Sequence, residues 1–181
     1  FNFLLKAGAA EGFTVEAATT IEVEGERVSS TRLRQVLADG DLDLAQKLLG
    51  RPFSITGRVM HGQALGRQLG APTANIQLKR KNTPLSGVFM VSTEVDGLAQ
   101  PAVANIGMRP SVKSDGQPHL EVHLLNYKGD LYGRLLRVTF HRKLRDEQRF
   151  ASLEALKTAI EADIAAAREY WRASPFTTSQ D

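Results

Sequence analysis

Cysteine is absent from the 181 residues, which excludes a disulfide scaffold and any metal site built on thiolates. We expect a reducing location, the cytoplasm. No apolar run approaches membrane-spanning length, and the first residues lack the charged-then-apolar pattern of a signal peptide. The Gly-Lys-Ser/Thr ending of a Walker loop is also missing. The sequence therefore points away from membrane proteins, disulfide-rich secreted proteins and P-loop enzymes.

An excess of one charge sign is nearly lacking as well, since 23 Lys and Arg face 20 Asp and Glu. The basic residues are scattered, and the tight cluster at 79–81 is typical of a solvated loop. Aromatic residues make up only 7% and form no stacking pattern along the expected strands. A small basic barrel that binds nucleic acid is therefore the weakest of three functional hypotheses.

The first 48 residues predict a small α/β unit. We expect a helix over 3–10 that ends at Gly12, strands at 13–15 and 20–23, and helices over 31–38 and 41–49. The chain begins with Phe rather than Met and starts within a pattern, so we expect a fragment with further chain upstream.

Residues 49–174 predict a separate, mainly β domain. Alternating apolar residues indicate six strands, at 53–59, 74–78, 88–95, 99–106, 120–125 and 135–140. Turn residues separate them, which favours a small antiparallel barrel or sandwich. Apolar residues at helical spacing then predict a helix over 152–171, capped by Ser152 and packed on the strands. The polar tail at 175–181 is expected to be disordered.

The loop at 66–75 is the strongest candidate for a polyphosphate site. Its glycines let backbone N–H groups approach anionic oxygens, and Pro72 stiffens the entry to the next segment. If 73–75 is extended, Thr73 and Asn75 point to one face and offer hard oxygen ligands suited to Mg²⁺. The alternative is a polar turn that leads into an edge strand.

Glu121 is the candidate general base for transfer to a hydroxyl group. On a strand it shares a face with His123, whereas Val122 and Leu124 share the other face. A carboxylate on a barrel strand can also be an ordinary solvent-facing residue. His123 is the rival base by its pKa, although a packed or surface histidine is the interpretation we prefer.

Two further segments have both a functional and a plain interpretation. Arg145 and Phe150, on a loop before the last helix, can hold a planar heteroaromatic ring, or can belong to a charged helix entry. Hydroxyls at Ser29, Ser30 and Thr31, followed by Arg34, form either an anion site at a helix start or an ordinary helix cap.

The residue sequence of these motifs resembles that of riboflavin kinases, including the kinase half of bifunctional riboflavin kinase/FAD synthetases. The resemblance covers about residues 50–171. It is carried in order by Gly66-Arg67-X-Leu69-Gly70-X-Pro72-Thr73-Ala74-Asn75, Gly87-Val88-Phe89, Asn105-Ile106-Gly107, Glu121-Val122-His123-Leu124-Leu125, Leu131-Tyr132-Gly133 and Leu144-Arg145-X-Glu147-X-X-Phe150.

The resemblance implies a six-stranded antiparallel Greek-key barrel with a C-terminal helix, and Mg²⁺-dependent phosphorylation of riboflavin by ATP to give FMN and ADP. Glu121 matches the catalytic base, and Thr73 and Asn75, the candidate Mg²⁺ ligands, lie within the first of these motifs. Flavin contacts are implied at Arg145, Gln148 and Phe150. Nucleotide contacts are implied at Arg67, Gly70, Thr73, Asn75, Leu124, Asn126 and Tyr132. Asn126-Tyr127 and Pro110-Ser111-Val112 depart from the usual pattern at their positions.

The N-terminal segment resembles the end of a nucleotidylyltransferase domain. Ser29, Ser30, Thr31 and Arg34 match a motif that contacts ATP phosphates there. This implies residues 1–48 are the remnant of an FMN adenylyltransferase domain, missing upstream in this chain, whose full-length parent also makes FAD. We expect small molecules as its substrates, and neither nucleic acid nor a membrane as a partner. The alternative function is a flavin- or nucleotide-binding barrel without catalysis.

Overall fold

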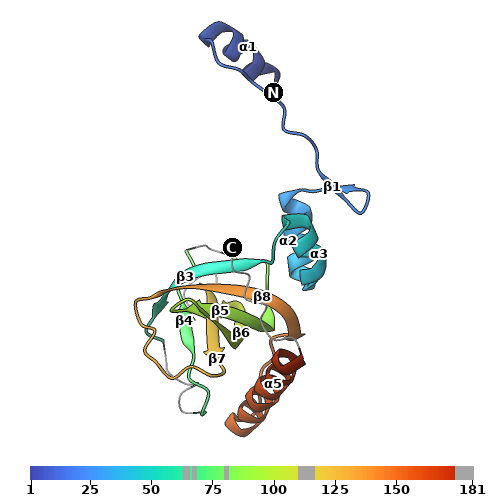
Figure 1. Cartoon of the computed structure of the whole chain (residues 1–181). Helices are drawn as coiled ribbons and strands as arrows, with labels where there is room; N and C mark the ends of the chain where they lie inside the picture. The colour runs from blue at the N-terminus through green and yellow to red at the C-terminus, as the bar shows by residue number, and fades with distance from the viewer. Residues whose placement is uncertain (63–65, 67–68, 80–81, 110–116, 174–181) are drawn as a thin grey trace.

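The computed structural model describes residues 1–62, 66, 69–79, 82–109 and 117–173. Figure 1 shows helices and a short hairpin at the N-terminus, followed by a β-barrel and a long C-terminal helix. This agrees with the mainly β architecture that the sequence predicts, with α and β elements ahead of it.

The first helix, α1 (Asn2–Glu11), ends at Gly12, whose φ of 75° is a left-handed conformation that glycine adopts without strain. The chain then runs outside any strand to the hairpin of β1 (Glu22–Val23) and β2 (Glu26–Arg27). The predicted strand at 13–15 is therefore wrong. Of the one at 20–23, the last two residues form strand pairs, and Ile21 O accepts one further bond from the Val28 N–H, at 2.8 Å. A strand needs a partner for its backbone groups, and no described segment provides one here.

The next two helices confirm the predicted ones. In α2 (Ser30–Asp39) the Ser29 hydroxyl accepts a bond of 3.1 Å from the Arg32 backbone N–H. In α3 (Leu42–Leu49) the Asp41 carboxylate caps Leu44 in the same way, at 2.9 Å. The buried side of α3 packs into the barrel core through Leu42, Ala45 and Leu48.

Six antiparallel strands close the barrel in the order β3-β4-β7-β6-β5-β8. Their connection is a Greek key, because β5, β6 and β7 are consecutive neighbours and β8 returns to lie beside β5. This confirms the predicted fold. The strands are β3 (Ser54–Met60), β4 (Ala74–Ile76), β5 (Gly87–Val95), β6 (Leu98–Arg109), β7 (Gln117–Leu124) and β8 (Leu135–Arg145).

The barrel interior is filled by alternate residues of each strand. On β7, Leu120, Val122 and Leu124 are buried, whereas Glu121 and His123 on the other face are partly exposed. Phe89 and Phe140 meet edge to face inside the core, with ring centroids 5.4 Å apart. The alternation that the sequence predicts for β7 is therefore the observed one.

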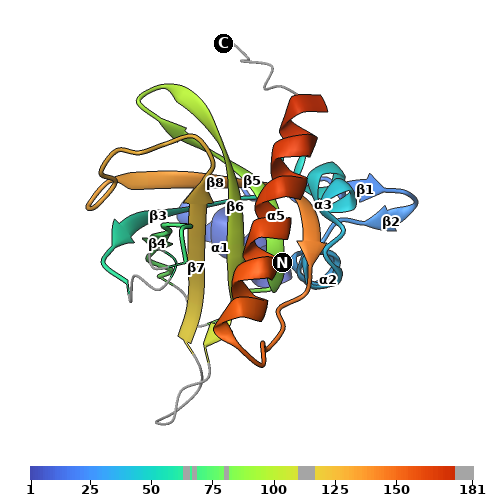
Figure 2. The same ribbon diagram turned by 90° about the horizontal axis from the view of Figure 1, so that it is seen from below.

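The C-terminal helix α5 (Leu153–Ala173) begins where predicted, because the Ser152 hydroxyl accepts a bond of 3.1 Å from the Ala155 N–H. Figure 2 shows α5 lying along the outside of the barrel beside β6. Its apolar side packs on Val88, Met90, Val103 and Leu125 through Ala167 and its neighbours. Across the described residues no helix has the length and apolarity needed to cross a bilayer. The tail at 175–181 lies outside the described residues.

Candidate active site

Two cavities lie on either side of β7 and meet at Thr73, which lines both. The Glu121 cavity, about 380 Å³, is bounded by β6, β7, the end of β8 and α5, and contains Glu121 and His123. The Tyr132 cavity, about 540 Å³, contains Val122, Leu124 and Tyr132. Since successive residues of a strand point to opposite faces, one strand serves both cavities. Both volumes are in the range that accommodates a small organic ligand.

Glu121 occupies the middle of a row of polar residues that crosses three strands. It is the direct partner of Asn75 on β4 and of Asn105 on β6. Directly opposed residues in antiparallel strands project to the same face. The Glu121 carboxylate therefore lies between the amides of Asn75 and Asn105, and Glu121 and Asn105 line the Glu121 cavity.

The glycine-rich loop before β4 is compact. Gly66 O accepts bonds from the N–H groups of Leu69, at 3.2 Å, and Ala71, at 2.8 Å. A side chain on Gly66 would place its Cβ 2.4 Å from the Ala71 carbonyl oxygen. Gly70 has a φ of 82° and is exposed, outside the described linings of both cavities. Arg67 lies outside the described residues.

Asn75 is covered by a second glycine rather than by a side chain. A Cβ on Gly62 would lie 2.1 Å from the Asn75 Nδ2 atom. Thr73 precedes β4 and Asn75 lies within it, with the buried Ala74 between them. Thr73 and Asn75 are therefore on the same side of the strand, as the extended conformation requires.

His123 ties this loop to β7. Its Nδ1 atom lies 2.9 Å from the Pro72 carbonyl oxygen. A carbonyl only accepts, so the imidazole donates an N–H at Nδ1, and a neutral ring keeps its lone pair at Nε2. The bond holds Pro72, and with it the adjacent Thr73, against the strand that carries Glu121.

The Tyr132 cavity has an aromatic margin. The rings of His61 and Tyr132 are stacked, with centroids 3.9 Å apart and planes 28° from parallel. Leu124 and Tyr132, two of the implied nucleotide contacts, both line this cavity. Asn126 is exposed and does not line it, so the departure from the family pattern at Asn126 falls at a position away from the cavity wall.

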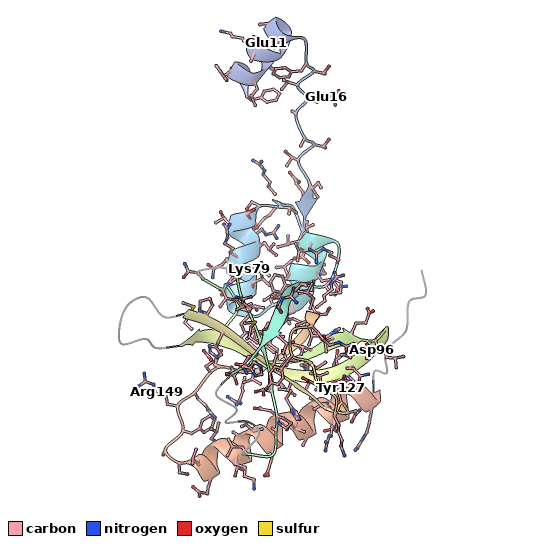
Figure 3. All side chains as sticks on the ribbon, turned by 90° about the vertical axis from the view of Figure 1, so that its left-hand side faces the viewer. Glu11, Glu16, Lys79, Asp96, Tyr127 and Arg149 are labelled. Atoms are coloured by element: carbon pink, nitrogen blue, oxygen red, sulfur yellow. The ribbon has the colours of Figure 1, made fainter. Side chains whose placement is uncertain are left out.

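The implied flavin contacts lie together on the Glu121 cavity, which Arg145, Gln148 and Phe150 all line. The sequence predicts a loop at Arg145, but the prediction is wrong, because Arg145 is the last residue of β8. The strand extends five residues beyond the expected end because β5 continues to pair with it as far as Val88 and Arg145. Arg149, in the following loop, is exposed at the margin of the molecule (Figure 3).

Sequence reasoning missed three polar residues of this cavity: Asn105, Glu147 and Asp163. The Glu147 carboxylate lies 3.4 Å from His119 Nε2 and 3.3 Å from the Ser86 hydroxyl. It lies over Gly107, where a Cβ would come within 1.9 Å of it. Asp163 had a detectable signal, because it interrupts the apolar side of α5 between Ile160 and Ala167.

The Ser29–Arg34 motif lies away from both cavities. Ser29 caps α2, and Ser30, Thr31 and Arg34 are exposed. None of the four lines the two cavities just described.

A closed barrel with two cavities of this size beside one strand is typical of a protein that binds small molecules. The profile of the Flavokinase family, described as riboflavin kinase, matches residues 49–171. The chain belongs to the riboflavin kinase family.

Its curated relatives are bifunctional riboflavin kinase/FMN adenylyltransferases. The relative from Pseudomonas fluorescens is 66% identical over 93% of this chain and 54% of its own length. The one from Escherichia coli strain K12 is 51% identical over 94% of this chain and 55% of its own length. The chain thus spans about half the length of these relatives.

A solved structure from Streptococcus pneumoniae shares the fold. It is 34% identical, with a TM-score of 0.73, and the match covers 83% of this chain and 50% of that chain. That structure is of a protein named as a macrolide-efflux protein.

Proposed function

We propose that this protein is a riboflavin kinase that transfers the γ-phosphoryl group of ATP to the 5′-hydroxyl of riboflavin, giving FMN and ADP. One observation carries the proposal: Glu121 lies in one cavity, and that cavity meets a second one at Thr73. Phosphoryl transfer needs donor and acceptor in line, with a group positioned for the hydroxyl proton. Two cavities that meet beside a carboxylate provide this arrangement.

Riboflavin is assigned to the Glu121 cavity and ATP to the Tyr132 cavity. The Glu121 cavity combines apolar walls from α5 with Phe150, Gln148 and Arg145, which suits a planar ring that also carries carbonyl groups. Leu124, Tyr132 and Thr73, which line the Tyr132 cavity, are assigned to the nucleotide. Asn75 is assigned with them because it shares a face of the strand with Thr73. Arg67, Gly70 and Asn126 remain predicted nucleotide contacts on the resemblance alone.

Thr73 and Asn75 fit a Mg²⁺ ion that arrives with the nucleotide. A hydroxyl and an amide are neutral oxygen ligands, and Mg²⁺ normally completes its shell with waters and substrate phosphates. Within the described ranges, no group of three or more His, Cys, Asp or Glu could bind an ion without such help. When bound, Mg²⁺ would neutralise phosphate charge.

Glu121 is assigned as the general base. In the proposed step its carboxylate accepts the proton of the 5′-hydroxyl as the oxygen–phosphorus bond forms and the bond to ADP breaks. Its direct neighbours on the adjoining strands are the amides Asn75 and Asn105.

The N-terminal 48 residues are proposed to be the end of an FMN adenylyltransferase domain, and the parent protein is proposed to be bifunctional and cytoplasmic. The domain and the second activity rest on the relatives' names and on Ser29, Ser30, Thr31 and Arg34, and the location rests on the lack of cysteine. In this chain Ser29 is engaged as a helix cap. The rest of that domain's ATP site, with its His-containing phosphate motif, is not in the 181 residues, and residues 1–60 contain no histidine. FMN with MgATP should therefore yield no FAD from the 181-residue protein, and chromatographic detection of FAD would contradict this.

The test of kinase activity is incubation of the pure protein with riboflavin and MgATP, followed by chromatography for FMN and ADP in equal amounts. A Glu121→Gln protein is the matched control for contaminating kinases. Riboflavin binding with no FMN from the wild-type protein would instead support the non-catalytic binding barrel.

A further inference from the structure

Arg145 and Asp163 form a two-pronged ion pair in the wall of the Glu121 cavity. Arg145 Nε lies 3.0 Å and 3.2 Å from the two Asp163 carboxylate oxygens, and Nη2 lies 2.7 Å from Oδ2. The Asp163 side chain is only 11% exposed and that of Arg145 25%. The pair joins the end of β8 to the middle of α5, and both residues line the cavity.

The same guanidinium group organises the loop that follows β8. Arg145 Nη1 donates a hydrogen bond of 3.1 Å to the carbonyl oxygen of Asp146, which is the first residue of that loop. The guanidinium carbon lies 5.6 Å from the centre of the Phe150 ring, within the range of a cation–π contact. One cation thus fixes the beginning of the loop and contacts the aromatic ring that lines the cavity.

Stability alone does not account for this pair. The helix α5 already packs on the barrel through Ala167 against Val88, Met90 and Val103. A buried ion pair adds little net stability, since the cost of removing two charges from water offsets their attraction. An ion pair that lines the cavity beside the apolar residues Leu156, Ile160 and Ile164 of α5 is better explained by what it holds in place.

We propose that Asp163 is a positioning residue for the ring of riboflavin, acting through Arg145 and Phe150. This inference rests on the proposed function. Arg145 alone is a long side chain with many rotamers, and Asp163 restricts it to one orientation. Within the described residues the observed bonds occupy three of its five N–H groups, and the other two can donate to a ring carbonyl oxygen.

The test is Asp163→Asn, which keeps the size of the side chain and removes its charge. Riboflavin affinity, measured by quenching of flavin fluorescence, should fall about 10- to 100-fold, the usual cost of losing a charged hydrogen bond. The KM for riboflavin should rise in parallel, while the KM for ATP stays unchanged because the Tyr132 cavity is untouched. A purely structural residue would lower the melting temperature and leave the riboflavin affinity of the folded protein as it was, and that result overturns the proposal.

Matched variants sharpen the test. Glu161→Gln removes a carboxylate from the same helix, where it faces Lys157 at 3.9 Å on the surface, and should leave both KM values unchanged. Phe150→Leu combined with Asp163→Asn should weaken riboflavin binding by less than the sum of the two single changes, because they share one path. Additive effects would contradict an action through Phe150.

If Asp163→Asn does not fold, Arg145→Lys carries the same test. It keeps the charge but not the planar fork, so riboflavin affinity should still fall, and an unchanged affinity overturns the proposal. Wild-type protein that binds riboflavin together with variants of equal affinity overturns this inference alone. Wild-type protein that does not bind riboflavin overturns the proposed function and this inference with it.

Discussion

Asn75 and Glu121 are direct partners across β4 and β7, so the amide and the carboxylate project side by side from one surface of the barrel. The first belongs to the predicted metal and phosphate site, and the second is the predicted base. Their spacing is set by the pairing of two strands, which is more rigid than a loop. The consequence is that each can be removed separately without moving the other.

Replacement of Glu121 by Gln should lower kcat by about 10²–10⁴-fold and leave both KM values nearly unchanged, because the lost interaction occurs mainly in the transition state. Steady-state kinetics with varied riboflavin and varied ATP measure this. A residual rate is expected from positioning and electrostatics.

The control for Glu121 is His123→Gln, which removes the rival base. Since His123 donates to the Pro72 carbonyl, its loss should loosen Thr73 and raise the KM for ATP more than it lowers kcat. If His123→Gln abolishes turnover while Glu121→Gln is nearly normal, the base is His123.

Asn75→Ala should remove most activity, about tenfold or more, because a ligand of the proposed Mg²⁺ is lost. The fold should survive, because the Asn75 side chain is only partly buried. Activity measured against Mg²⁺ concentration should shift to higher metal in the variant. Full FMN production by the variant in excess chelator would rule out the metal role.

Gly107→Ala should impair riboflavin use more than stability. Its Cβ would lie 1.9 Å from the Glu147 carboxylate, which is the end of a flexible side chain and can move aside. That movement breaks the contacts of Glu147 with His119 and Ser86 and releases the loop that carries Gln148 and Phe150. We expect the KM for riboflavin to rise by up to about 10²-fold, a usual effect of misplaced binding groups.

The double variant Gly107→Ala with Glu147→Ala separates steric conflict from loss of contact. If the new methyl group acts only by displacing Glu147, the double variant should match Glu147→Ala alone. A double variant worse than both single variants would show that Gly107 has a separate role.

His141 should make the folded state less stable in mild acid. Burial lowers its pKa below the ordinary value of 6.5. Above that value the ring is neutral in both states and adds no pH dependence. As the pH falls below it, the unfolded chain takes up the proton while the folded protein resists, so the free energy of unfolding decreases until the folded pKa is reached.

The free energy of unfolding, measured with denaturant at several pH values between about 5 and 8, checks this prediction, because the usual pKa of histidine lies within that range. His141 bonds Ser92 through Nε2 at 2.8 Å and meets the Trp171 ring edge on, so His141→Gln is the conservative comparison. The acid-side decrease should be smaller in that variant. An identical slope in both proteins would assign the effect to other groups.

The barrel could be predicted from the sequence because its signals are local. Alternation on β7, turn residues between strands, and the apolar spacing of α5 each indicate one element without knowledge of the others. The loop at 66–75 and Glu121 can be identified from the residue sequences of the motifs that contain them. The placement of Thr73 and Asn75 on one side follows from strand geometry.

Contacts between distant segments could not be read in the same way. The bond from Arg145 to Asp163 depends on how α5 lies across the end of β8. The position of Glu147 over Gly107 depends on the course of the loop that joins β8 to α5. That residues 13–21 form no strand could not be predicted for the related reason that a strand requires a partner, which the segment itself cannot reveal.

Strand β7 also limits how this protein can change in length. Val122 and Leu124 line one cavity, and Glu121 and His123 line the other. A one-residue insertion or deletion inside the strand would turn every following side chain to the opposite face. It would carry the carboxylate into the apolar core and an aliphatic group into its place, so variation in chain length across this protein is expected in the turns and not within β7.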